Sequence, residues 1–286
     1  MLKEYRYAVV GGDTRFCYLI KYMQDNGHNV KCFGLEKSEV VCCALNTILE
    51  ESEVLILPLT TSNDGIYVNM PLSEKGATLE YIADNFKGKY IFCAKAEKSF
   101  LDKCRQKGIK SFDYYDREDL TILNAIPSAE GALGIALSET AHTVHGSTCL
   151  VTGFGRISKV LSKYLLNLGA QVYITARKAE DFAGITTLGA VGVKYNELTK
   201  IAPQTDIVFN TVPSIILNQT NLDHFSSDTL FIDLASKPGG IDLKYAAQKG
   251  LKVIWALGLP GKTAPKTSGE MVIKTIFNIL IEEETQ

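Results

Sequence analysis

The chain has 286 residues, of which 46% are hydrophobic and 22% are charged. This length predicts two domains, and the apolar share is sufficient for buried cores. The 30 basic and 32 acidic residues leave a net charge of −2, which gives no electrostatic footprint for nucleic acid or for an anionic membrane. The composition indicates a soluble globular protein rather than a disordered, collagen-like or disulfide-stapled one.

The seven cysteines are typical of a cytoplasmic protein. No two of them have the C-x-x-C spacing, and their odd number argues against a disulfide framework. The four histidines show no metal-ligand spacing, so no metal site is predicted. The first residues are too polar for a secretory signal, and no window approaches the roughly 20 apolar residues of a membrane span. We therefore expect mostly buried free thiols in a cytoplasmic protein.

The first half of the chain alternates short apolar runs with amphipathic stretches. The apolar runs predict strands at residues 7–10, 30–34, 54–59, 90–94 and 109–112. The amphipathic stretches predict helices at residues 16–26, 78–86 and 98–107. Strands that alternate with helices imply right-handed crossovers and a mostly parallel sheet.

A second series of strands and helices follows a break at residues 124–131. This break contains Pro127 and Gly131, and Ser128 is a suitable N-cap, so we expect a helix to begin there after a domain boundary. The later strands are predicted at residues 148–152, 171–175, 206–211, 230–234 and 253–257. Helices are predicted at residues 157–168 and 268–284.

The chain is thus predicted to be an α/β protein with two doubly wound parallel-sheet domains. Bridging helices are expected near residues 128–145 and 268–284. The first domain is predicted at residues 1–124, with residues 266–286 as a C-terminal helix that packs back on it. The second domain is predicted at residues 125–265.

The strongest motif follows the strand predicted at residues 148–152. Gly153 and Gly155 form a G-x-G turn that leads into a helix, which is the frame of a dinucleotide-binding unit. The first glycine permits a tight turn, and the second lets the backbone approach a pyrophosphate that the helix amides bind. Ser158 replaces the third glycine of the fingerprint. We predict a nucleotide site at Gly153, Gly155, Arg156 and Ile157; the alternative is a glycine-rich turn in a Rossmann domain that binds no nucleotide.

The end of the next strand bears on the choice between NADP and NAD. An NAD site usually carries an acidic residue there, which binds the ribose 2′-hydroxyl. This chain instead has Thr175, Arg177 and Lys178, and arginine can bind a 2′-phosphate. We therefore favour NADP. The alternative is that the two cations are solvated and that Glu180 or Asp181 binds the ribose.

Three segments that follow later strands are expected to be defined loops at the rim of the cofactor site. The predicted cofactor contacts in these segments are Thr211, Val212, Pro213, Leu234, Ala235 and Gly258. The third segment also contains Lys262 and Lys266, which are candidates to bind an anionic substrate. Taken alone, each of these lysines is more typical of a solvated loop residue than of a substrate ligand.

The first half contains a related turn at Gly11-Gly12-Asp13-Thr14-Arg15. It also joins a strand to a helix, so its amides can bind an anion and Arg15 adds positive charge. Thr60 follows another strand and is expected at the same sheet edge. We predict that Gly12, Asp13, Thr14, Arg15 and Thr60 bind a substrate carboxylate; the alternative is a purely structural turn.

Six segments together resemble the dipicolinate synthase A chain family, whose product is pyridine-2,6-dicarboxylate. They are residues 10–15, 124–131, 145–147, 211–220, 233–240 and 258–266. More broadly, the chain is similar to the NAD(P)-dependent 2-hydroxyacid dehydrogenases. That similarity implies a flavodoxin-like first domain and a Rossmann second domain.

The chain departs from those dehydrogenases in its proton donor. They use a His–Glu pair and an Arg to reduce a keto group, whereas the loop after Gly258 has no His and the loop at residues 233–240 has Ser236-Lys237 in place of the Arg. The family resemblance instead implies oxidation of dihydrodipicolinate, with hydride transfer to NADP⁺, in the mother cell of a sporulating bacterium. It also implies a heteromeric complex, in which the partner is the flavoprotein-like B chain of dipicolinate synthase.

The dicarboxylate substrate requires two anion sites. We assign Arg15 and its turn to one carboxylate, and Lys262 or Lys266 to the other. The acceptor of the ring proton stays open between water, Lys266 and Ser214. The alternatives are a 2-hydroxyacid or amino-acid dehydrogenase with an unusual site, and a non-catalytic cofactor-binding subunit.

Overall fold

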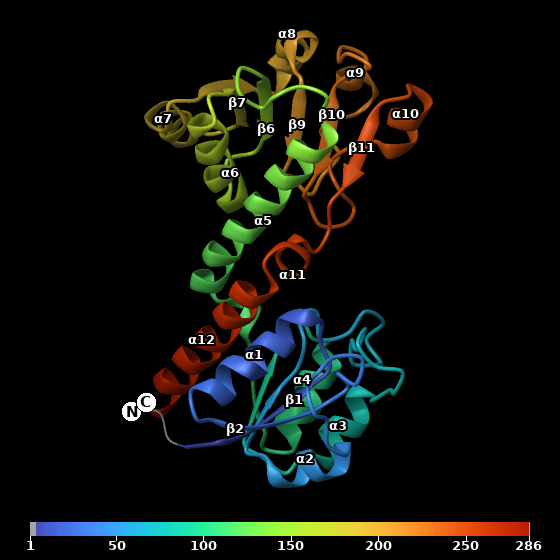
Figure 1. Cartoon of the computed structure of the whole chain (residues 1–286), viewed down its shortest axis with the longest axis vertical. Helices are drawn as coiled ribbons and strands as arrows, with labels where there is room; N and C mark the ends of the chain where they lie inside the picture. Colours follow the sequence, from blue (N-terminus) through green and yellow to red (C-terminus); the bar gives the residue numbers. More distant parts are fainter. Residues whose placement is uncertain (1–3, 286) are drawn as a thin grey trace. The chain divides into compact units, whose positions relative to one another are not determined.

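The computed structural model describes residues 4–285. These residues form two compact units, residues 4–124 with residues 264–285 and residues 125–263. Each unit contains a parallel sheet with helices on both faces (Figure 1). The predicted fold class, two doubly wound parallel-sheet domains, is confirmed.

The first unit contains a five-stranded sheet. Its strands are β1 (Arg6–Val10), β2 (Asn29–Phe33), β3 (Val54–Ile56), β4 (Tyr90–Cys93) and β5 (Lys110–Asp113). Their order is β2-β1-β3-β4-β5, and every neighbouring pair is parallel. This is the strand order of flavodoxin-like sheets. All five strands were predicted, although β3 ends three residues earlier than expected.

Strand residues of the first unit alternate between two hydrophobic cores. Tyr7 and Val9 face a core that α1 and α12 cover, whereas Ala8 and Val10 face a core that α2, α3 and α4 cover. The helices are α1 (Thr14–Asp25), α2 (Leu45–Glu51), α3 (Leu79–Asn85), α4 (Lys98–Gln106) and α12 (Pro265–Glu284), with a 3₁₀ turn η1 (Tyr114–Asp116). Helix α2, which spans only seven residues, was not predicted from the sequence.

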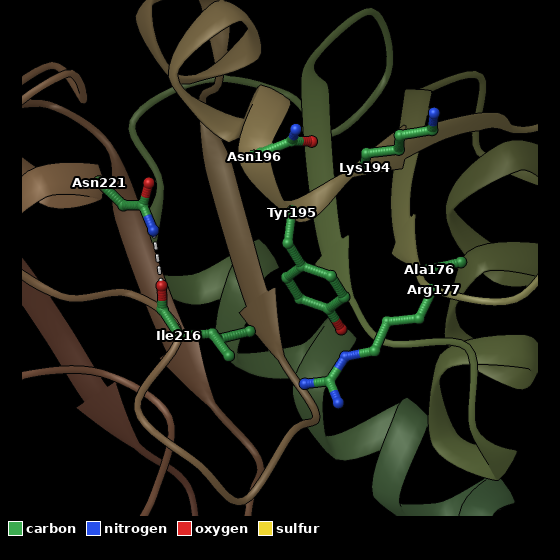
Figure 2. A pocket seen from close by; sticks show the side chains of 7 residues that line it. All are labelled: Ala176, Arg177, Lys194, Tyr195, Asn196, Ile216 and Asn221. Atoms are coloured by element: carbon green, nitrogen blue, oxygen red, sulfur yellow. Dashed lines mark hydrogen bonds between the residues drawn. The ribbon is translucent and has the colours of Figure 1, made fainter.

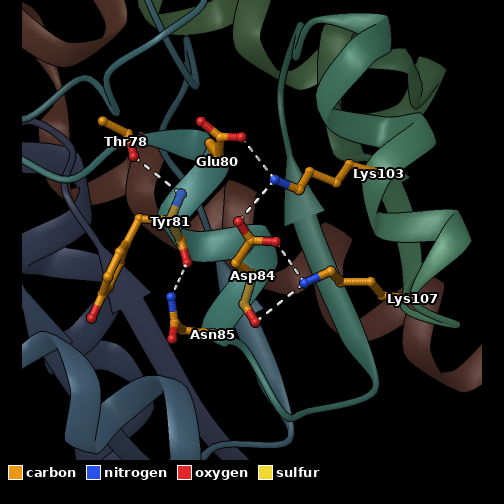
Figure 3. A network of polar contacts seen from close by, with 7 residues as sticks. All are labelled: Thr78, Glu80, Tyr81, Asp84, Asn85, Lys103 and Lys107. Carbon is orange, nitrogen blue, oxygen red and sulfur yellow. Dashed lines mark hydrogen bonds and ion pairs between the residues drawn. The ribbon is translucent and has the colours of Figure 1, made fainter.

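Ion pairs join α3 to α4 on the surface of the first unit (Figure 3). Lys103 Nζ lies 3.1 Å from Glu80 Oε1 and 2.9 Å from Asp84 Oδ2. Lys107 Nζ lies 2.6 Å from Asp84 Oδ1. The hydrogen bonds from both lysines lower the pKa of Asp84. Because this network is exposed, it orients the two helices but adds little stability.

The second unit contains a six-stranded parallel sheet. Its strands are β6 (Thr148–Thr152), β7 (Gln171–Ala176), β8 (Val191–Lys194), β9 (Ile207–Asn210), β10 (Leu230–Asp233) and β11 (Lys252–Trp255). Their order is β11-β10-β9-β6-β7-β8. This is the Rossmann order, and its direction reverses between β6 and β9, where ligands of such sheets bind. Strand β8 was not predicted from the sequence.

Helices cover both faces of this sheet as well. Cys149 and Val151 of β6 face a core shared with α5, α6 and α7, and Leu150 faces a core shared with α8, α9 and α10. The longer helices are α5 (Glu118–Glu139), α6 (Arg156–Asn167) and α7 (Ala179–Leu188). The short ones are η2 (Tyr195–Glu197), α8 (Leu198–Ile201), η3 (Ala202–Gln204), α9 (Gln219–Leu222), α10 (Leu243–Gln248) and α11 (Leu259–Thr263).

The predicted helix start at Ser128 is wrong. One helix, α5, begins at Glu118 and continues through Pro127. A proline inside a helix removes one backbone hydrogen bond and costs about 3 kcal/mol. Burial of the side chains of Ala125, Ala129 and Ala132 stabilises the continuous helix and offsets this cost.

Among the described residues, α5 is long and apolar enough to cross a membrane by length and composition alone, which the sequence analysis did not expect. However, α5 contributes Leu120 to one hydrophobic core and Ala129, Ala132 and Ala136 to another. This packing is typical of a core helix.

All seven cysteines are free thiols, and four of them are buried: Cys32, Cys93, Cys104 and Cys149. Burial raises the pKa of Cys93 and Cys149 to about 12 and that of Cys104 to about 11. Because the thiolate is the reactive form, these buried groups are unreactive near neutral pH.

Titration of the native protein with Ellman's reagent at pH 8 is expected to modify only Cys17, Cys42 and Cys43 rapidly. These three are partly exposed. The other four thiols should react after unfolding in guanidinium. Rapid modification of Cys149 in the native protein, identified by peptide mapping, would contradict the packing of β6.

Candidate functional site

The turn after β6 leaves open space at the start of α6. Gly153 has a φ of +82°, and a Cβ there would lie 2.8 Å from Val212 Cγ2, so the position requires glycine. Gly155 is the N-cap of α6, and no atom lies within 4 Å of a Cβ built on it. The first-turn amides of a helix have no intrahelical partner and lie at its positive end. The turn can therefore accept a phosphate group.

A buried hydrogen-bond network joins the ends of β6, β9 and β10. Thr152 Oγ1 donates to Asn210 Oδ1 at 2.6 Å, and Asn210 Nδ2 donates to Asp233 Oδ1 at 2.7 Å. The Asp233 carboxylate also accepts the amides of Ala235 at 3.0 Å and Gly240 at 2.9 Å. This network fixes the loop after β10 relative to the neighbouring strand ends.

Two predicted cofactor residues use their hydroxyl groups to hold the backbone. Thr175 Oγ1 accepts the amide of Gly153 at 2.9 Å, and Thr211 Oγ1 donates to the carbonyl of Thr152 at 2.7 Å. These side chains therefore shape the glycine turn rather than point into it. Among the other predicted cofactor residues, Ala235 is buried, whereas Pro213 is exposed. Ser214 is exposed as well and makes no hydrogen bond with any residue in the range 4–285.

The segment predicted as the third loop of the rim is mostly helical, so that prediction is wrong. Gly258 is a turn residue with a φ of +69°, but α11 follows immediately and contains the exposed Lys262. Lys266 is the second residue of α12, and Pro265 is its first. Proline at the first helical position starts a helix without losing a hydrogen bond, which explains why this Pro-containing segment is not a loop.

Arg177 follows β7 and lines a cavity of about 480 Å³. Its guanidinium lies against the ring of Tyr195, and the Cζ atom is 5.3 Å from the ring centre (Figure 2). Other lining residues come from the end of β8 and from the segments after β8 and β9, namely Lys194, Asn196, Ile216 and Asn221. Within residues 4–285 Arg177 has no ion-pair partner, whereas Lys178 Nζ lies 3.6 Å from Glu180 Oε1.

Six of the lining residues were not predicted as site residues: Ala176, Lys194, Tyr195, Asn196, Ile216 and Asn221. Lys194 is the last residue of β8, and Tyr195 and Asn196 follow it; this strand was not predicted. The alternation of Val191 and Val193 after Gly189, itself a helix C-cap, was the available signal for that strand.

In the first unit, the predicted amide cradle of the glycine turn is wrong for two of its amides. The amide of Gly11 donates to the carbonyl of Phe33 at 2.8 Å, and that of Gly12 donates to the carbonyl of Asn69 at 3.0 Å. These bonds hold the turn against neighbouring segments. The two amides are therefore not available to a substrate carboxylate.

Arg15 is 8% exposed and is held by two partners. Its Nη2 atom donates to Asp13 Oδ2 and to the carbonyl of Leu59, both at 2.8 Å, and its Nε atom donates to Asp13 Oδ1 at 2.9 Å. Asp13 is also the N-cap of α1. The guanidinium is thus fixed against the carbonyl of Leu59, which precedes the half-buried Thr60, and its Nη1 atom makes no hydrogen bond within residues 4–285.

Helix α12 packs closely against α1 (Figure 1). A Cβ on Gly269 would lie 2.2 Å from the carbonyl oxygen of Arg15, so the two backbones touch near the first turn of each helix. Further along, Lys274 Nζ lies 5.0 Å from the ring centre of Tyr22. The two helices therefore run in the same direction. Lys266, one turn before Gly269, lies at the same end of the pair as Arg15.

Comparisons with known proteins agree with both halves of this arrangement. Residues 6–115 match the family described as the N-terminal domain of the dipicolinate synthase A chain. Residues 133–237 match the NAD-binding domain of D-isomer-specific 2-hydroxyacid dehydrogenases. The chain is 32% identical to the dipicolinate synthase A chain of Bacillus subtilis (strain 168), over 100% of this chain and 99% of that one. The chain belongs to the dipicolinate synthase A chain family.

Solved structures support this membership. The crystal structure of the dipicolinate synthase A chain from Bacillus subtilis has a TM-score of 0.87 and 31% identity, over 100% of this chain and 98% of that one. The dipicolinate synthase A chain from Bacillus halodurans also has a TM-score of 0.87, with 26% identity over 98% and 99% of the two chains. Salmonella D-lactate dehydrogenase, at 15% identity and a TM-score of 0.67 over 96% of each chain, shares the fold alone.

These findings confirm the predicted family and a nicotinamide-binding domain of the dehydrogenase type. The protein is an oxidoreductase component of the dipicolinate synthase type.

Proposed function

We propose that this protein oxidises dihydrodipicolinate to dipicolinate and transfers a hydride to NADP⁺. The substrate loses one hydride and one proton, and its ring becomes aromatic. Relatives named as dipicolinate synthase A chains match the whole chain. The observation in the structure that carries the proposal is the α1–α12 pair, which has Arg15 and Lys266 at one end. Two cations at one end of a helix pair suit a substrate with two carboxylates.

The dinucleotide site fits the turn after β6. The open space at Gly155 and the helix start at Arg156 and Ile157 suit the pyrophosphate. Bound there, NADP⁺ supplies the hydride acceptor. The strand-end segments are proposed to line the rest of the dinucleotide, through Thr175, Thr211, Val212, Pro213, Leu234, Ala235 and Gly258. The network around Asp233 keeps these segments in place.

The preference for NADP over NAD is proposed to come from Arg177. It has no ion-pair partner within residues 4–285, so its charge is available to a 2′-phosphate. The nearby Glu180, which is the candidate acceptor for the ribose hydroxyl of NAD, is paired with Lys178. This arrangement supports the NADP assignment.

The Arg177→Gln variant tests the cofactor assignment. We expect its KM for NADP⁺ to rise about 10- to 100-fold, because a charge-assisted bond to the 2′-phosphate is lost. The KM for NAD⁺ should change less than about twofold, since NAD⁺ has no phosphate there. Lys178→Gln is the matched control and should have a small effect, because Lys178 already pairs with Glu180. Equal rises for both cofactors in Arg177→Gln would exclude the assignment.

The substrate site is proposed at the N-terminal end of α1 in the first unit. The Nη1 atom of Arg15 binds one carboxylate, while Asp13 and the carbonyl of Leu59 hold the guanidinium. Thr14 and Thr60 flank it, and Gly12 supplies the backbone turn with a φ of +107°. Lys266 binds the second carboxylate, with Lys262 as the alternative. Positioning of the ring carbon against the nicotinamide provides most of the catalysis.

The ring proton leaves to Lys266, Ser214 or water. Ser214 has no hydrogen-bonded base within residues 4–285 and therefore lacks the means to act as a strong proton acceptor. Aromatisation of the ring favours proton loss without a strong base. The reaction is proposed to occur in the cytoplasm of a sporulating mother cell, in a complex with the flavoprotein-like B chain of the synthase.

The decisive experiment is to measure NADPH formation by the chain alone and together with that flavoprotein-like partner. The substrate is the product of the preceding biosynthetic enzyme. NADPH formed together with dipicolinate supports the proposal. Absence of turnover in both mixtures favours a non-catalytic cofactor-binding subunit. Turnover of a 2-hydroxy acid or an amino acid instead favours an unusual member of those dehydrogenases.

A further inference from the structure

The cavity beside Arg177 has an aromatic wall that the proposed function does not use. This wall is the ring of Tyr195, the first residue of η2. Figure 2 shows Arg177 reaching across the cavity toward this ring, while the ammonium of Lys194 points away from the guanidinium. Tyr195 therefore contacts the proposed phosphate-binding arginine from the wall of the cavity.

The position of the Tyr195 ring is set by the protein core. Tyr195 packs, partly buried, against the hydrophobic cluster that contains Leu198 and Leu217. Leu198 begins the next helix, α8, so the ring is fixed from its own side of the cavity. A ring with one face on the core can offer its other face to a cation.

Arg177 needs such a support. It is exposed and has no ion-pair partner within residues 4–285, and a long exposed side chain loses rotamer freedom when a ligand immobilises it. A residue that already restricts the arginine reduces this loss and strengthens binding of the ligand. The distance of 5.3 Å from Cζ to the ring centre is within the range of a cation–π contact.

We propose that Tyr195 is a positioning residue that holds Arg177 ready for the 2′-phosphate of an adenosine moiety. This inference rests on the proposed preference for NADP and names a residue that strengthens that preference. Tyr195 acts through Arg177 and makes no bond to the phosphate itself. The alternative role is a simple wall of the cavity, which would affect dinucleotides with and without the 2′-phosphate equally.

Fluorescence titrations of the full chain with NADPH and NADH distinguish these roles. The two ligands differ only in the 2′-phosphate, so the ratio of their Kd values isolates its recognition. In Tyr195→Leu we expect the preference for NADPH to fall about three- to fivefold, which is the effect of losing an exposed cation–π contact. Tyr195→Phe keeps the ring and should keep the preference. NADH binding by each variant serves as the folding control.

A double-mutant cycle completes the test. In the Arg177→Gln background, Tyr195→Leu should not change the NADPH preference further, because its effect passes through Arg177. Equal weakening of NADPH and NADH by Tyr195→Leu would overturn the positioning role and leave Tyr195 as a wall. A preference that falls in Arg177→Gln but not in Tyr195→Leu would overturn it too. If the unmodified protein has no preference for NADPH, the NADP proposal itself fails.

Discussion

Replacement of Arg15 with methionine is expected to lower kcat/KM for the dicarboxylate substrate about 100- to 1000-fold. The substitution removes the guanidinium that Asp13 and the Leu59 carbonyl hold in place. A buried charged donor to a carboxylate contributes about 1.5–3 kcal/mol, and loss of orientation at the reacting carbon adds to that. Most of the effect should appear in KM, whereas the KM for NADP⁺ should not change.

The controls for Arg15→Met must separate loss of substrate binding from loss of protein stability. Without Arg15, the carbonyl of Leu59 and the carboxylate of Asp13 lose a donor, which costs about 1–3 kcal/mol of stability. Arg15→Lys keeps the charge but cannot bind Asp13 and Leu59 with the same fork, so an intermediate kcat/KM is expected. The exposed Arg6→Gln is the control and should leave kinetics unchanged. A folded Arg15→Met variant with normal KM would refute the substrate site.

The second large effect is expected from Gly269→Ala. The new Cβ would lie 2.2 Å from the carbonyl oxygen of Arg15 and 3.1 Å from the amide nitrogen of Leu19. Both are backbone atoms, so α12 must move away from α1. We expect a loss of about 3 kcal/mol in the free energy of unfolding, at the upper end of overpacking effects. Separation of the helices should also raise the KM for the dicarboxylate, because Lys266 moves relative to Arg15.

Gly134→Ala is the matched control for this experiment. Gly134 also lies inside a helix, α5, but no atom lies within 4 Å of a Cβ built on it. The substitution should therefore stabilise the protein by about 0.5–1 kcal/mol through helix propensity alone. Urea unfolding curves measure both variants. A Gly269→Ala protein as stable as the wild type would show that α1 and α12 are not in backbone contact.

The regular part of the fold could be predicted because the sheets are buried on both faces. Continuous apolar runs such as 7–10 and 148–152 have few alternatives to a parallel strand. The prediction was wrong where local rules conflict with packing. Pro127 favours a break, but the buried alanines around it stabilise a continuous helix. β8 was missed because it lies at the sheet edge, where Val191 is exposed and the apolar run is short.

The candidate site was predictable where backbone chemistry dictates the residue. Gly153 carries that information, because its positive φ and the nearby Val212 side chain require glycine there. Contacts between residues far apart in the sequence cannot be predicted from any local sequence pattern. The bond from Arg15 to the carbonyl of Leu59 spans 44 positions, and the contact of Arg177 with Tyr195 depends on an unpredicted strand. The occupied amides of Gly11 and Gly12 likewise required the structure, since their acceptors are Phe33 and Asn69.

The return of α12 to the first unit has a consequence for synthesis of the protein. Five residues of this helix, Val272, Ile273, Ile276, Ile279 and Leu280, belong to the core on one face of the first sheet. The ribosome releases them only after all of residues 125–263 have been made. Domains generally fold in the order in which they emerge, but here the unit that starts first must wait for its last helix. Until then, α1 alone covers that face of the sheet, so part of its core is open to chaperones, and the second unit can finish folding before the first.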